Sequence, residues 1–257
     1  MKKHTYVSES LKNGKILRWT FMPLKVYIAP MNFYSKQGQG AKYHQLVKKA
    51  LDAWQSATRG RVSFQVVGSL LESNVNVEWK RVERKALGHC YFSFDGANRL
   101  YGAEVAIGLT DGAIHSDYMD EGEVYHTILH EIGHAIGLGH SPYKEDIMYT
   151  PHMKGVLNIS DGDALTVNWL YSLAQGATVS EISSKYGVGG VDIDEIISKY
   201  MDKKNPTEFE KVRKSIHLPT RDLLDEAEAI GHLRKYHLAL QNVQISPDVK
   251  KFFNKPK

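Results

Sequence analysis

One stretch, HTILHEIGHAIGLGH at residues 126–140, constrains the fold of this chain more than any other. It places His130 and His134 four residues apart. In a helix, four residues turn the chain about 40° past one full circle and advance it roughly 6 Å, so both imidazoles point to one side. Glu131 lies between them in the sequence. It would lie near the same metal ion, but not in line with the two histidines. This H-E-x-x-H spacing is typical of two zinc ligands and a general base.

A third ligand has to come from chain that turns back toward the helix. His126 lies on the same face, but the row from His126 to His134 spans roughly 12 Å along the axis. Zinc–nitrogen bonds are only about 2.0–2.1 Å long, so this row cannot close around one ion. Gly137 is placed to end the helix, because glycine tolerates the positive φ that a reversal often needs. His140, three residues later, is therefore the expected third ligand of a single zinc ion.

The complete string H-E-I-G-H-A-I-G-L-G-H matches the pattern H-E-x-x-H-x-x-G-x-x-H at every fixed position. The segment EDIMY that follows supplies a methionine, Met148. Over roughly residues 20–175 the chain resembles the metzincin zinc peptidases, and among them the matrixins. The resemblance implies an α+β catalytic domain with a twisted, mostly parallel sheet, an antiparallel edge strand and long packed helices. It also implies that Met148 lies beneath the zinc and is not a ligand.

Hydrophobic periodicity and composition divide the chain of 257 residues into three parts. Residues 1–20 are polar and are expected to be loosely ordered, and residues 21–175 form the matrixin-like domain. After AQGAT at 174–178, residues 178–257 are expected to form an all-helical extension with helices at 179–188, 192–201 and 221–241. Within the domain we expect strands at 23–29, 61–67, 74–80 and 99–109, and helices at 41–58, about 121–137 and 160–173, the last capped by Ser160.

The resemblance implies hydrolysis of peptide bonds in a protein or peptide substrate by metal-activated water, with Glu131 as general base. The sequence also fits a second class of function. This alternative is a non-catalytic zinc-binding interaction module, whose C-terminal helices dock a partner.

Substrate contacts are expected on a strand and on the zinc-binding helix. In enzymes of this kind a peptide lies extended along an edge strand, and we assign that strand to YGAEVAIG at 101–108. Its small residues, notably Ala103 and Ala106, either admit a peptide or simply pack a helix on the sheet. By the resemblance, His126 lies near the base of the S1′ pocket. The other interpretation of His126 is a partly buried histidine without a role in binding.

Other partners and cofactors have little support. A net charge of +4 is too small for a nucleic-acid binder, and no apolar run of about 18 residues exists to span a membrane. Calcium ions are possible in the acidic loop at 110–121 but unsupported, and a solvated loop is the better interpretation. His89, His115 and Asp117 lack the spacing of a second zinc site.

Compartment, regulation and oligomeric state are not fixed by the sequence. No apolar signal segment follows the first lysines, whereas the family is usually secreted. The single cysteine, Cys90, lacks the P-R-C-G-x-P-D context of the pro-segment cysteine that caps the zinc in matrixins. It is therefore interpreted as a core or loop residue.

Overall fold

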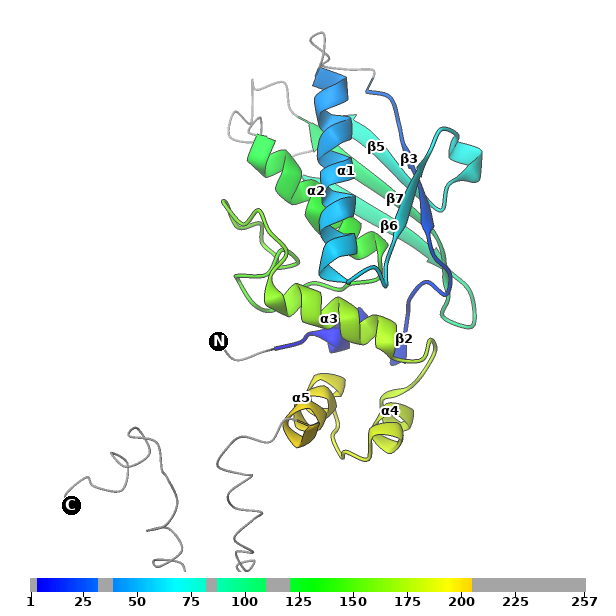
Figure 1. Ribbon diagram of the computed structural model, residues 1–257, viewed down its shortest axis with the longest axis vertical. Coiled ribbons are helices and arrows are strands. Elements are labelled where there is room, and N and C mark those ends of the chain that lie inside the picture. Colours follow the sequence, from blue (N-terminus) through cyan, green and yellow to red (C-terminus); the bar gives the residue numbers. More distant parts are fainter. Residues whose placement is uncertain (1–3, 32–38, 82–86, 110–120, 205–257) are drawn as a thin grey trace, which may run out of the picture. The chain divides into compact units, whose positions relative to one another are not determined.

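The computed structural model describes residues 4–31, 39–81, 87–109 and 121–204 (Figure 1). Its main element is a five-stranded sheet with the strand order β4-β3-β5-β7-β6. Four strands are parallel, and β6 pairs antiparallel with β7 at one edge. This confirms the expected fold class. The strands are β3 (Leu24–Ile28), β4 (Phe64–Val67), β5 (Val75–Arg81), β6 (Gly88–Phe94) and β7 (Leu100–Leu109).

Strand β6 was not among the strands expected from alternation, because its apolar residues Cys90, Tyr91 and Phe92 are consecutive. Its presence also overturns the assignment of residues 101–108 to the edge of the sheet. Strand β7 lies between β5 and β6, with Ala103 opposite Val75 on one side and Phe92 on the other. Alternation shows which side chains share a face, but it does not show which strands are neighbours.

Two helices cover one face of the sheet, α1 (Gln39–Ala57) and α2 (Glu121–Ala135) (Figure 1). The inward side chains of the central strands, such as Val26, Val77 and Val105, are fully buried beneath them. Trp54 of α1 is also fully buried, and its Nε1 donates to the carbonyl oxygen of Leu129 at 2.9 Å. This bond and the apolar contact fix α2 against α1 and the sheet.

The N-terminal residues 4–20 are well packed, so the expectation of a loosely ordered segment is wrong for this part. They form a 3-10 helix, η1 (Val7–Ser10), and a short hairpin of β1 (Leu11–Lys12) and β2 (Lys15–Ile16). Five apolar side chains are almost completely buried: Tyr6, Val7, Ile16, Leu17 and Trp19. They are scattered among polar residues without a period, which is why the sequence pattern does not reveal them.

Helix α3 (Asp161–Ser172) begins with the expected Ser160 cap, here a full capping box with Asp163. The Asp163 side chain is fully buried and also holds other segments. It accepts hydrogen bonds from the hydroxyl of Tyr6 at 2.5 Å and from the backbone nitrogen of Ile147 at 2.8 Å. One carboxylate therefore ties the N-terminal segment, the turn before Met148 and the start of α3 together.

Helices α4 (Val179–Tyr186) and α5 (Ile193–Lys204) follow α3. The ring of Trp169 in α3 contacts the rings of Tyr186 and Tyr200. Both helices up to Tyr200 belong to the compact unit Met1–Tyr200. The assignment of residues 178–257 to a separate extension stays a prediction, and the helix expected at 221–241 lies outside the described residues. In the described part of the chain, no helix is long and apolar enough to cross a membrane.

Replacing Asp163 with Asn is expected to destabilise the protein by about 2–4 kcal/mol. The amide keeps one oxygen, but its NH2 group faces donors such as the backbone nitrogens of Ile147 and Ser160. Urea unfolding followed by tryptophan fluorescence measures the change. Asp161→Asn is the control, because Asp161 is an exposed residue in the same helical turn. Equal unfolding midpoints for Asp163→Asn and the parent would contradict this account.

Candidate metal centre

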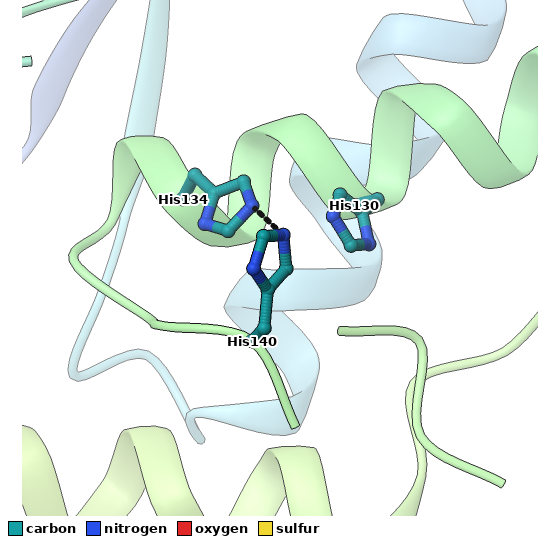
Figure 2. A group of neighbouring side chains, drawn as sticks. All are labelled: His130, His134 and His140. Atoms are coloured by element: carbon teal, nitrogen blue, oxygen red, sulfur yellow. Dashed lines mark hydrogen bonds between the residues drawn. The ribbon is translucent and has the colours of Figure 1, made fainter. Parts of the chain in front are cut away.

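Three histidines converge at the end of α2, as Figure 2 shows. His130 and His134 extend from the helix, and His140 faces them from the chain that follows its end. Each offers one nitrogen, and these three atoms lie within 4.8 Å of one another. The Nε2 atoms of His134 and His140 are 3.2 Å apart. Two nitrogens bound to one tetrahedral zinc ion lie roughly 3.4 Å apart, so the cluster fits such an ion.

Backbone carbonyls orient the two helical imidazoles. The Nδ1 of His130 donates to the carbonyl oxygen of Ile147, and the Nδ1 of His134 donates to that of Leu138, both at 2.8 Å. With Nδ1 protonated, the Nε2 lone pair of each ring is free for a metal. Burial lowers the pKa of His130 to about 4 and that of His134 to about 3. Both rings are therefore neutral at pH 7, as metal binding requires.

Two glycines shape the end of α2 and the turn that leads to His140. Gly137 has a φ of +98°, and the backbone nitrogen of Leu138 donates to the carbonyl oxygen of Gly133 at 3.0 Å. Gly133 lies against the sulfur of Met148, so that a Cβ at this position would collide with it. Met148 is fully buried, with its sulfur packed against the helix at Gly133.

Glu131 is buried beside the histidine cluster, and burial raises its pKa to about 8. Among the described residues its carboxyl group has no hydrogen-bond partner. A Cβ on Gly88, the first residue of β6, would lie only 2.6 Å from the Glu131 Cγ. Gly88 thus allows the edge strand to approach the carboxyl group closely. The sequence pattern gave Gly88 no role, because the strand that begins there was not recognised.

His126 lies outside the cluster of ligand atoms. Its ring is stacked on that of His130 at a centroid distance of 6.2 Å, and its Nδ1 donates to the carbonyl oxygen of Val156 at 2.6 Å. The ring of His152 lies 3.9 Å away, and its Nε2 is hydrogen-bonded to the carboxyl group of Glu123. His126 therefore connects the zinc-binding helix to the segment at 152–156.

The other expected site residues lie elsewhere or outside the described residues. Ala103 and Ala106 are buried, and the backbone of both is paired with β5 and β6. They can therefore not line an open edge of the sheet. Cys90 is a free, partly buried cysteine in β6, and burial raises the pKa of its thiol. The loop at 110–120, with most of the candidate calcium ligands and with His115 and Asp117, lies outside the described residues.

Comparison with known proteins agrees with this geometry. The family model described as Matrixin matches residues 28–172, which are more than half of the chain. The match includes β4 to β7, both long helices, the three histidines, Met148 and α3. A search of curated proteins finds no match. The chain therefore belongs to the matrixin family of zinc-dependent endopeptidases.

Proposed function

We propose that this protein is an endopeptidase that holds one catalytic zinc ion on His130, His134 and His140. The observation that carries the proposal is the convergence of three imidazole nitrogens within 4.8 Å in a chain of the matrixin family. Two of these rings already present the correct nitrogen through their bonds to carbonyl oxygens.

Glu131 is the proposed general base. His130, His134 and His140 would hold the zinc ion, which would supply a Lewis acid to polarise the scissile carbonyl and to make bound water more acidic. The Glu131 carboxylate takes a proton from the attacking water and passes it to the leaving amine. Burial raises the pKa of Glu131, and the positive charge of a zinc ion held by the neighbouring histidines would lower it again, so that the carboxylate form would be available near pH 7.

Strand β6 is the proposed site of substrate pairing. Among the described residues, no strand pairs with its outer edge. An extended peptide adds to such an edge by main-chain hydrogen bonds. Gly88 brings this edge against Glu131, so a peptide on β6 passes beside the general base. His126, with His152 and Glu123 next to it, is proposed to form a polar wall of the S1′ pocket that the resemblance implies.

Replacing His140 with Ala is expected to weaken zinc binding by more than about 100-fold, the upper end of the loss seen when only a partner of a ligand is removed. Competition with a chromophoric chelator measures the affinity. His126→Ala is the control, since His126 is on the same helix but outside the cluster, and it should keep stoichiometric zinc. A His140→Ala protein that holds zinc as tightly as the parent would exclude His140 as a ligand.

Replacing Glu131 with Gln is expected to keep zinc and to lower kcat by roughly 10²–10⁴-fold, because the amide cannot accept the proton of water. Cleavage of a mixed peptide library, with and without a chelator, provides the measurement. Glu121→Gln, on the exposed first turn of the same helix, should cut like the parent. Stoichiometric zinc without chelator-sensitive cleavage in the parent would instead favour the non-catalytic module.

Replacing Gly88 with Ala is expected to lower kcat by about 10–100-fold with unchanged zinc affinity. The new methyl group would lie 2.6 Å from the Glu131 Cγ, so the carboxyl group must move away from its position. Gly102→Ala is the matched control in β7, because its Cβ would have its nearest neighbour at 3.9 Å. If both variants cleave peptides at the parent rate, Gly88 does not position Glu131.

A further inference from the structure

The N-terminal strap, which we define as residues 4–10, lies against the loop of the third histidine. Neither the strap nor α5 is part of the region at 28–172 that matches the matrixin family. Figure 1 shows the blue N-terminal segment beside α3, and contacts between η1 and α3 confirm this placement. The strap therefore contacts the loop of the zinc site, although its residues lie outside the matched region.

Gly139, the residue before His140, is the point of contact. Its backbone nitrogen donates to the hydroxyl of Ser10 at 2.9 Å, and Ser10 is buried. A Cβ on Gly139 would collide with the carbonyl group of Glu9 and would lie 3.0 Å from the Glu9 Cβ. Gly139 has no positive φ, so its glycine is needed for the close approach of the strap and not for a turn.

His140 is the ligand that depends most on such support. His130 and His134 each donate from Nδ1 to a carbonyl oxygen, whereas His140 has no such acceptor among the described residues. Its side chain is also more exposed than the other two. What holds His140 is the chain on either side of it, with Ser141 bonded to Met148 through their backbones at 2.8 Å on one side and Gly139 bonded to the strap on the other.

Glu9 adds a negative charge near this ligand. Its side chain is exposed, while its backbone packs on Gly139. Because Glu9 packs on the residue before His140, its negative charge favours a dication bound by that ring.

Asp194 in the first turn of α5 anchors the strap. One carboxylate oxygen accepts from the hydroxyl of Thr5 at 2.6 Å and from the backbone nitrogen of Val7 at 2.7 Å. The other accepts from the backbone nitrogen of Ser8 at 3.0 Å and from its hydroxyl at 2.5 Å. Four donors on one carboxylate make a strong, charge-assisted attachment just before Glu9 and Ser10.

We propose that α5 and the N-terminal strap position the third zinc ligand, with Asp194 as the anchor and with Glu9 and Ser10 as positioning residues for His140. The proposal rests on the zinc site proposed above. It gives α5 a role in the metal centre, although the helix itself contributes no ligand. None of the three residues touches the substrate or the reacting atoms in this scheme.

The test is zinc affinity, measured on the full chain by competition with a chromophoric chelator. Glu9→Gln and Asp194→Asn are expected to weaken binding by about tenfold each, the lower end of the loss seen for partners of metal ligands. Glu195→Gln is the matched control, because Glu195 neighbours Asp194 on α5 but pairs with Lys199 in solvent. It should bind zinc like the parent.

The same substitutions made in a His140→Ala background separate positioning from general stability. If Asp194 and Glu9 act through His140, neither changes the residual zinc affinity of that background. Equal losses in both backgrounds would overturn the proposal, as would an affinity of Glu9→Gln within twofold of the parent. Glu9 is exposed, so this variant decides the matter even if Asp194→Asn does not fold.

These measurements also distinguish this proposal from the proposed function. A parent that binds zinc but cleaves no peptide would overturn the enzyme assignment, and the affinity differences would still support the strap. A parent that cleaves peptides while Glu9→Gln and Asp194→Asn bind zinc normally would overturn the strap alone.

Discussion

The convergence of three imidazole nitrogens within 4.8 Å is the constraint on which the rest of this structure depends. A straight helix can bring only two of them together, so the chain has to reverse within six residues of His134. Gly137 supplies the reversal, and Gly133 lets Met148 pack directly beneath it. The packing around the site thus keeps the three nitrogens together. A small displacement of the reversed chain would separate the His140 nitrogen from the other two.

Buried carboxylates hold the segments beneath the metal centre in place. The Asp163 carboxylate accepts hydrogen bonds from the Tyr6 hydroxyl and the backbone nitrogen of Ile147. The Asp146 carboxylate accepts hydrogen bonds from the hydroxyls of Ser141 and Ser160 at 2.5 Å each. Such groups are costly to bury unless donors surround them, and here the donors come from segments far apart in the chain. The carbonyl oxygen of Ile147, which orients His130, belongs to this network through its own backbone nitrogen. Polar contacts below the site are therefore coupled to the direction of a metal ligand.

Local features of this chain could be predicted from its sequence, and long-range ones could not. The spacing of His130, His134 and His140 determines their meeting, because helix geometry and one glycine turn are local properties. The place of β7 inside the sheet depends on β6, whose consecutive apolar residues hide its alternation. The burial of residues 4–20 depends on partners at least 129 positions away, such as Gly139 and Asp194. No pattern within a short window contains that information.

The three ligands differ in how they are held, and this difference links the family domain to the segments around it. His130 and His134 are fixed twice, by the helix and by a carbonyl oxygen at 2.8 Å. His140 is fixed only through its neighbours in the chain, and one of these, Gly139, is bonded to Ser10. In our proposal the N-terminal strap replaces the missing carbonyl contact, and Asp194 keeps the strap in position. A helix that contributes no ligand can then influence zinc binding, because the least constrained ligand sets how well the whole site is formed.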